Sequence, residues 1–334
     1  MGTRSMGVER LAEIAAPGTG AARIGLGLAA VGRPAYINLG RDRDLPAERP
    51  VEVMRRRSHE LLDAAYAAGV RYLDAARSYG RAEEFLADWL LERPDAARDV
   101  VVGSKWGYTY VAEWRTDAET HEVKDHGIET FERQRELTDA LLGDRLDLYQ
   151  IHSVTPESPA LTDPGLHARL AGLAAEGVTV GVSTSGPGQA EAIRAALAVE
   201  VDGRPLFRTV QSTYNLLEPS AGAALAEAHA AGRAVIVKEA VANGRLTAAA
   251  ERLPEALRRV TEETGATPDA VALAAVLHRP WVTVVLSGAA TTDQLRSNLA
   301  AADLRLDESR LALLEELAEP AETYWRHRSE LPWA

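Results

Sequence analysis

Short apolar segments alternate with longer amphipathic segments along most of the chain. The short segments are apolar on both faces, which predicts buried strands. They cover residues 23–31, 70–74, 100–104, 146–152, 178–183, 209–213, 234–237 and 282–286. The longer segments place apolar residues at helical spacing. These predicted helices cover residues 51–68, 83–91, 129–142, 164–175, 189–198, 221–230 and 254–264.

This alternation predicts the fold class. Strands that are buried on both faces and joined through helices run parallel, and eight such units close into an α/β barrel of the (β/α)8, or TIM barrel, type. A chain of 334 residues is within the range of single-domain barrels. We therefore expect one barrel domain with a C-terminal tail over residues 21–334. Residues 1–20 lack strong periodicity and are expected to form a tail or a short cover.

Two long loops interrupt the alternation, at residues 32–50 and 106–130. Both follow the carboxyl ends of predicted strands, which is the face where barrel active sites are built. The second loop carries Trp106, Tyr108 and Trp114, which we expect to form a wall for an apolar substrate, with surface cover as the alternative. The tail carries Trp325 and Trp333, and it either closes over the site or packs against the barrel side.

The composition excludes several classes of protein. A formal net charge of −12 argues against a nucleic-acid partner, and the absence of cysteine excludes disulfides and thiolate chemistry. No run of 18 apolar residues is present to span a membrane, and the N-terminus lacks the apolar core of a signal peptide. We therefore expect a cytoplasmic protein. Because a closed barrel leaves no strand edge open, we expect a monomer.

Four ionisable residues lie at or just beyond the ends of consecutive predicted strands. Asp74 ends the second strand and Tyr79 follows it, Lys105 follows the third strand, and His152 ends the fourth. A barrel brings these positions together at one face. Lys105 also stands out because only three of the 37 basic residues are lysine. The set resembles the Asp-Tyr-Lys-His tetrad of the aldo-keto reductase superfamily.

This resemblance implies an oxidoreductase that reduces an aldehyde or ketone to an alcohol by hydride transfer from a nicotinamide. Tyr79 would be the general acid, although a free tyrosine has a pKa of about 10. Lys105 would lower that pKa, Asp74 would hold the lysine, and His152 would orient the carbonyl. The alternative for each residue alone is a structural role, as an ion pair or in packing.

Later segments resemble the cofactor-binding parts of the same family. The resemblance implies that Ser183 and Gln211 hold the nicotinamide carboxamide, with Thr184 beside them. The stretch VVLSGAATTDQLRSNLAAA matches the segment that binds the phosphates and adenosine, where a turn opens onto a helix N-terminus. Its matched positions are Ser287, Gly288, Ala289, Gln294 and Asn298. NADPH is the expected cofactor, and NADH is less favoured.

One departure from the family concerns the seventh strand. Relatives often place an aromatic residue there, against the nicotinamide ring, where this chain has Lys238, Glu239 and Ala240. Lys238 is a candidate cofactor contact, and an ion pair with Glu239 is equally compatible with the sequence. The departure keeps an alternative function open, a nicotinamide-binding regulatory or redox-sensing module with little turnover.

Two further motifs resemble binding sites but lack part of the required pattern. Residues 25–30 fit the glycine pattern of a dinucleotide-binding turn, but Pro34 follows where that motif needs a helix. His121, Glu122 and His126 resemble metal ligands, but their spacing does not match H-E-x-x-H. We expect a solvated loop there and no metal site.

Overall fold

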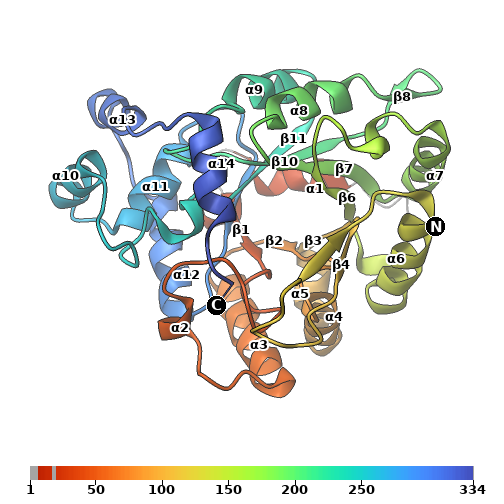
Figure 1. Cartoon of the computed structure of the whole chain (residues 1–334), viewed down its shortest axis with the longest axis horizontal. Helices are drawn as coiled ribbons and strands as arrows, with labels where there is room; N and C mark the ends of the chain where they lie inside the picture. The colour runs from red at the N-terminus through yellow and green to blue at the C-terminus, as the bar shows by residue number, and fades with distance from the viewer. Residues whose placement is uncertain (1–6, 17–19, 334) are drawn as a thin grey trace.

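The computed structural model of the chain describes residues 7–16 and 20–333. Parallel strands form a closed barrel in the order β1-β12-β11-β10-β7-β6-β3-β2, which confirms the predicted (β/α)8 fold (Figure 1). The strands are β1 (Ile24–Gly27), β2 (Tyr72–Asp74), β3 (Val101–Trp106), β6 (Leu148–Val154), β7 (Thr179–Thr184), β10 (Thr209–Thr213), β11 (Ala234–Lys238) and β12 (Val284–Ser287).

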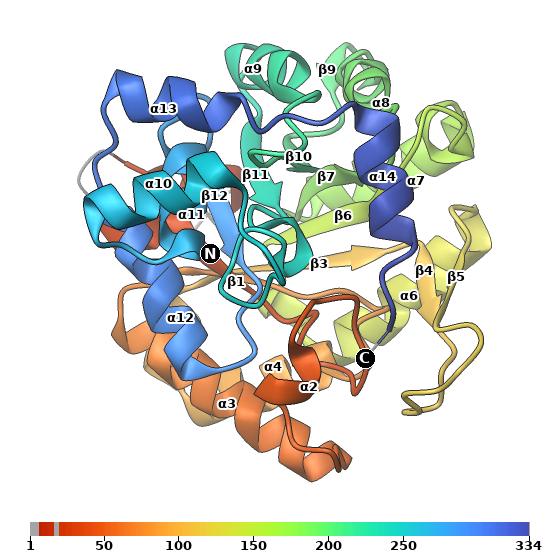
Figure 2. The ribbon, with the colours of Figure 1, turned by 60° about the vertical axis from the view of Figure 1, so that its left-hand side comes forward.

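Helices surround the barrel on its outer side (Figure 2). Those that match the predicted helices are α3 (Val51–Ala67), α4 (Ala82–Glu92), α6 (Ile128–Leu141), α7 (Pro164–Ala175), α8 (Gln189–Leu197), α9 (Gly222–Ala230) and α10 (Glu255–Thr264). The amphipathic pattern did not predict α1 (Gly7–Ile14), α2 (Arg41–Asp44), α5 (Pro94–Asp99), α11 (Pro268–Leu277), α12 (Thr292–Leu299), α13 (Glu308–Glu315) and α14 (Ala321–Ser329).

Helix α11 shows why some helices lack an amphipathic pattern. Nearly all of its residues are buried, so apolar side chains occupy every face and no helical period appears. Its start is nevertheless encoded in the sequence. Thr267 caps the helix by accepting a hydrogen bond from the Ala270 N–H, and Pro268 occupies the first turn.

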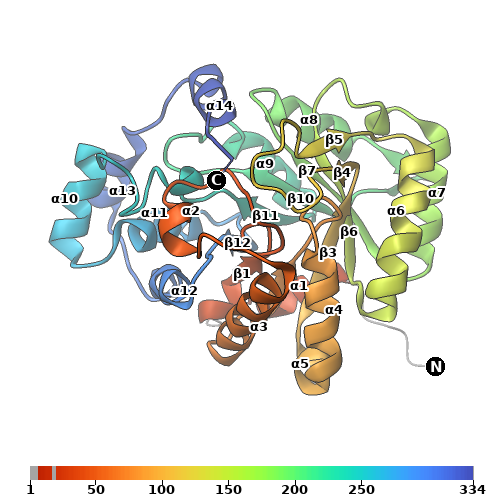
Figure 3. The same ribbon diagram turned by 60° about the horizontal axis from the view of Figure 1, so that its bottom comes forward.

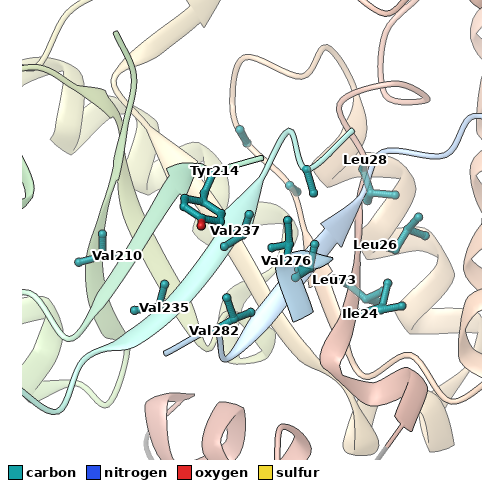
Figure 4. Packing of buried hydrophobic residues seen from close by; sticks show 14 of the residues in the cluster. Ile24, Leu26, Leu28, Leu73, Val210, Tyr214, Val235, Val237, Val276 and Val282 are labelled. Carbon is teal, nitrogen blue, oxygen red and sulfur yellow. The ribbon is translucent and has the colours of Figure 1, made fainter. Parts of the chain in front are cut away.

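Apolar side chains fill two parts of the core. The larger cluster lies between the strands and the surrounding helices and includes Leu26, Leu73 and Val235 (Figure 4). The smaller cluster fills the amino-terminal end of the barrel, where Leu11 of α1 packs with side chains from the strands. Part of the segment expected to be a tail or cover therefore forms α1, which closes this end.

Polar contacts fix α1 against the strands. The Val8 N–H donates to Thr179 Oγ1 at 3.1 Å, and Arg10 Nη1 donates to Asp147 Oδ1 at 2.7 Å. The backbone at Gly7 approaches Asp147 so closely that a Cβ atom there would lie 2.5 Å from its carbonyl oxygen. Helix α14 lies at the opposite end of the barrel, so the two ends are covered by different segments (Figure 3).

The two long loops contain little regular structure and are held by specific contacts. In residues 32–50, Arg41 donates to the carbonyl oxygens of Ala30 and Arg33, and Arg49 Nη1 donates to Pro34 O at 2.6 Å. In residues 106–130, β4 (Tyr108–Tyr110) pairs antiparallel with β5 (Glu122–Lys124). Buried guanidinium groups thus satisfy backbone carbonyls that lie outside helices and strands.

The two tryptophans of the C-terminal tail have different surroundings. Trp325 of α14 is buried in the core. Trp333 instead stacks on His121 with ring centroids 4.2 Å apart, near the mouth of the barrel. No helix in the described part of the chain is long and apolar enough to cross a membrane.

Candidate active site

A cavity of about 730 Å³ opens at the carboxyl ends of the strands. Its wall combines strand ends with the loop of residues 32–50, the β4–β5 hairpin, the segment after β11 and the C-terminal tail. Asp74, Tyr79 and His152 line it, and Lys105 lies directly behind them, fully buried. The structure therefore brings the four residues predicted from the strand ends to one site.

Lys105 connects the members of this tetrad. Its ammonium Nζ lies 2.5 Å from Asp74 Oδ2 and donates to Ala75 O at 3.0 Å. The same atom lies 3.4 Å from the hydroxyl of Tyr79. Three directions of the ammonium group are thus fixed by a carboxylate, a carbonyl and the phenol, which holds the tyrosine hydroxyl at the floor of the cavity.

Asp74 is itself fixed by one side chain of its own strand, β2, and by one from β10 across the barrel. Its Oδ1 atom accepts hydrogen bonds from the Tyr72 hydroxyl at 3.0 Å and from Gln211 Nε2 at 2.9 Å. With Lys105 on Oδ2, both carboxylate oxygens are satisfied in a buried setting. The orientation of the Asp74–Lys105 pair is therefore set by the barrel itself.

His152 faces Tyr79 across the floor of the cavity. The two rings are arranged edge to face with centroids 5.4 Å apart, and Ser78 Oγ lies 3.4 Å from His152 Nδ1. The contact with Ser78 leaves Nε2 as the ring nitrogen available to a ligand. Burial and the nearby charges of Lys105 and Lys238 hold the pKa of His152 well below its ordinary value. The imidazole is therefore neutral near pH 7 and can donate a hydrogen bond from its protonated ring nitrogen.

Lys105 was expected to lower the pKa of Tyr79, but the structure indicates a raised pKa. Burial and the nearby carboxylate of Asp74 raise the pKa of Tyr79 well above its ordinary value. Because Asp74 lies 2.5 Å from Lys105, its negative charge offsets part of the effect of the lysine charge on the phenol. The phenol consequently keeps its proton at neutral pH, as a proton donor must.

Arg33 is a residue of this site that the sequence analysis did not identify. Its guanidinium is 1% exposed and lies 5.2 Å from the ring centroid of Tyr79 and 4.9 Å from that of Trp333. It donates to Ser78 O at 3.0 Å and to Glu122 Oε1 at 2.5 Å. This cation lowers the pKa of Tyr79, against the larger effect of burial. Arg33 lies in the loop directly after the first strand, and this position was the feature of the sequence that could have predicted its place in the site.

Most of the predicted cofactor residues line the same cavity. These are Gln211, Lys238, Ser287, Gly288, Ala289, Gln294 and Asn298. Ser287 Oγ donates to Asn298 Oδ1 at 2.6 Å, and Gln294 Oε1 accepts from the Ala290 N–H at 2.8 Å. Gln211 Oε1 is buried and has no hydrogen-bond partner among the described residues. An unpaired buried acceptor beside the tetrad fits the amide N–H₂ of a nicotinamide.

Ser183 and Thr184 have other partners and lie outside the cavity wall. Ser183 Oγ accepts a hydrogen bond from the Ser153 N–H at 2.8 Å, and Thr184 Oγ1 lies 2.5 Å from Ser212 Oγ. Both residues are fully buried. Ser153 has a φ of 55° at the point where the pairing of β6 with β7 is interrupted, so Ser183 stabilises the turn just after His152.

The predicted aromatic wall is only partly present. Tyr108 lines the cavity, with its ring centroid 5.1 Å from that of His152. Trp106 is fully buried against Phe131, and Trp114 packs on Phe85 and donates to Arg49 O at 2.7 Å. Trp106 and Trp114 therefore do not reach the cavity in this structure, whereas Tyr36 and Trp333 do.

The histidines of the hairpin loop have structural contacts. His126 Nε2 lies 2.8 Å from His152 O, and His121 stacks on Trp333. Within residues 7–16 and 20–333, no three His, Cys, Asp or Glu side chains are grouped so that they could hold a metal ion.

The closed parallel barrel and the buried tetrad at its carboxyl end define a (β/α)8 barrel protein with an enzyme-like site. Residues 23–319 match the model of the aldo/keto reductase family, and the chain therefore belongs to this family. Family membership supports a nicotinamide-dependent oxidoreductase.

The chain is similar to one curated relative in sequence and to several solved structures in fold. The chain is 27% identical over 292 residues to aldo-keto reductase str7 of Strobilurus tenacellus, covering 79% of this chain and 81% of the relative. Among solved structures, an aldo-keto reductase from Bacillus halodurans in its holo form matches with a TM-score of 0.65 and 22% identity. That match covers 90% of this chain and 93% of the other. A putative aldo-keto reductase from Pseudomonas aeruginosa matches with a TM-score of 0.60 and 23% identity, covering 84% and 90%.

Proposed function

We propose that the protein reduces an aldehyde or ketone to an alcohol by hydride transfer from NADPH, with Tyr79 as the general acid. The observation that carries this proposal is the Lys105 ammonium, 2.5 Å from Asp74 and 3.4 Å from the hydroxyl of Tyr79, at the floor of a large cavity. Such a fixed proton donor beside a neutral histidine suits the protonation of a developing alkoxide.

Each residue of the tetrad has a separate task in this proposal. The neutral imidazole of His152 donates a hydrogen bond to the carbonyl oxygen and polarises the carbonyl. Tyr79 gives its proton to that oxygen as negative charge develops, and the Lys105 ammonium stabilises the phenolate that remains. Asp74 holds Lys105 in place. A bound reduced nicotinamide supplies the hydride to the carbonyl carbon.

Residues of the same cavity fit the cofactor. Gln211 offers its unpaired Oε1 to the carboxamide, and Ser287, Gly288 and Ala289 form the turn before the N-terminus of α12. A helix N-terminus with free N–H groups favours phosphate. Gln294 and Asn298 lie on the same helix and face the cavity, where they can contact the adenosine.

The first test of this proposal is turnover. We expect the purified protein to oxidise NADPH in the presence of 4-nitrobenzaldehyde, followed as a loss of absorbance at 340 nm, with the alcohol as product. If the protein binds the nucleotide but turns over none of a panel of aldehydes and ketones, the reductase proposal is wrong. That result would favour the binding module with little turnover.

The cofactor preference gives a second test. Arg43 lines the cavity next to Asp44, whose Oδ2 accepts a hydrogen bond from Gln294 Nε2 at 2.7 Å, and it is a candidate cation for the adenosine 2′-phosphate. We expect NADPH to bind about tenfold more tightly than NADH in fluorescence titrations, as one charge-assisted contact allows. Arg43→Ala should remove most of this difference. Arg296→Ala, which changes an exposed arginine paired with Asp293, serves as the control. Equal affinities in the wild type would contradict the preference.

A further inference from the structure

Lys238 differs from the other cations around the tetrad in lacking a close carboxylate partner. Lys105 pairs with Asp74 and Arg33 pairs with Glu122, each at 2.5 Å. Lys238, in contrast, reaches a carboxylate only at 3.9 Å, at Glu239 Oε1, within the part of the chain that the structure describes.

Glu239 is moreover already neutralised by another residue. Arg328 of α14 donates to both of its carboxylate oxygens, with contacts of 2.5, 2.9 and 3.0 Å. The wall of the cavity beside the tetrad therefore carries an excess positive charge, and Lys238 is the residue that supplies it.

The ammonium of Lys238 is also fixed in position. It donates to Thr213 Oγ1 at 2.9 Å, and the side chain is only 13% exposed. The Thr213 hydroxyl donates in turn to Glu239 Oε2 at 3.1 Å, so the group is tied to the end of β10. The charge therefore cannot swing out to solvent without breaking these contacts.

The strand register places Lys238 next to the expected position of the nicotinamide ring. Residues of β10 and β11 pair so that Gln211 lies beside Ile236 and Thr213 beside Lys238. Lys238 is thus two residues closer to the mouth of the cavity than Gln211, whose unpaired Oε1 fits the carboxamide. Both side chains line the cavity. A nicotinamide held at Gln211 has its ring beside the Lys238 ammonium.

The charge of that ring depends on its oxidation state. Oxidised nicotinamide carries one positive charge, whereas the reduced ring is neutral, and the remainder of the nucleotide is the same. Two unit charges within about 6 Å interact by several RT at an effective dielectric constant of about 20. We propose that Lys238 makes the cavity discriminate between the two redox states, so that it binds the reduced cofactor more tightly than the oxidised one. This inference rests on the proposed function, because it requires the cofactor in this cavity.

The charges that face Lys238 make its effect depend on pH. Burial, together with Arg328 and Lys105, lowers the pKa of Lys238 to about 8, and Glu239 opposes this change. The pKa of Glu239 is lowered to about 2, and that of Arg328 is raised, so both stay charged throughout the neutral and mildly alkaline range.

Of the other groups that face Lys238, His152 stays neutral because its pKa is lowered well below 6.5. The Lys105–Asp74 pair lies farther back and acts on Lys238 through both of its charges. Below pH 8 the protonated Lys238 opposes binding of the oxidised cofactor. Above pH 8 this opposition is lost as Lys238 loses its proton.

The test compares dissociation constants of both redox forms, measured by fluorescence titration or calorimetry. At pH 7, Lys238→Met should tighten binding of the oxidised form by about tenfold or more and change binding of the reduced form by less than about threefold. Lys238→Arg keeps the charge and should keep the wild-type ratio. Lys124→Met changes an exposed lysine of β5 and serves as the control. In the wild type, the oxidised form should bind more tightly as the pH rises from 7 to 9.5.

Two results would overturn the inference. One is a ratio of the two dissociation constants that Lys238→Met leaves unchanged, and the other is a wild-type ratio that does not vary between pH 7 and 9.5. If either result is obtained while aldehyde turnover is intact, only the inference on Lys238 is rejected, and the proposed reductase function stands. A wild-type protein that binds neither form rejects the proposed function as well.

Discussion

Tyr79→Phe should lower kcat for carbonyl reduction by about 10²- to 10⁴-fold, the range that a general acid contributes. The substitution removes only the hydroxyl that lies 3.4 Å from Lys105. The ring remains to pack against His152 and below Arg33, so the shape of the cavity is kept. Dissociation constants for the nucleotide should therefore change by less than about threefold.

A matched control separates the role of Tyr79 from a general effect of losing a hydroxyl. Tyr66→Phe removes a hydroxyl that donates to Asp99 at the surface, and it should leave kcat unchanged. If Tyr79→Phe keeps more than about a tenth of the wild-type kcat, the tyrosine is not the acid. Because burial raises the pKa of Tyr79, the wild-type rate should also stay constant across neutral pH and fall only in the alkaline range.

Lys105→Met should reduce both stability and turnover. The substitution leaves the carboxylate of Asp74 buried without its ion-pair partner, which costs about 3–5 kcal/mol of the free energy of unfolding. It also removes the cation that stabilises the phenolate of Tyr79, so kcat should fall by at least about 10²-fold. Lys105→Arg keeps the charge but not its compact shape in a fully buried site, and it should also lose most activity.

A double variant distinguishes these two effects. Asp74→Asn combined with Lys105→Met removes both charges and keeps an oxygen acceptor for Tyr72 and Gln211, whose hydrogen bonds end on Asp74 Oδ1. Denaturant unfolding should show most of the lost stability restored, while kcat stays low. Recovery of kcat in the double variant would contradict a catalytic role for the pair. A stable Lys105→Met protein would contradict the buried ion pair.

The sequence was sufficient to predict the barrel because each of its strands is buried on both faces and therefore appears as an apolar run. The ends of these runs were less certain, because pairing decides where a strand stops. The predicted first strand extends to residue 31, whereas β1 ends at Gly27. The N–H of Leu28 then donates to Asp74 O, and the chain turns into the long loop.

The site was predicted where it depends on strand ends and missed where it depends on loops. Lys105 and Trp106 are adjacent in β3, and successive side chains of a strand point to opposite faces. Since Lys105 faces the barrel interior, Trp106 must face the helices, where it meets Phe131. The alternation of side chains along a strand could therefore have excluded Trp106 from the predicted substrate wall.

The contacts that Arg33, Glu122, Arg328 and Trp333 make at the site could not be predicted from periodicity. These residues come from two loops, a helix and the tail, and they meet only because the chain folds back over the mouth of the barrel. Neither helical nor strand periodicity marks such positions, because their contacts are made between segments far apart in the sequence.

The pairing of β1 with β12 has a consequence for how the protein folds during synthesis. These strands close the barrel, and a hydrogen bond from Arg23 to Val282 O beside them spans 259 residues. At about 5–20 residues per second, tens of seconds pass on the ribosome between the two strands. For that time β1 has an unpaired edge, which favours association with other chains. β2 pairs with the other edge of β1 and leaves this one uncovered. Exposure of this edge during translation should therefore limit the yield of folded protein more than the stability of the finished barrel does.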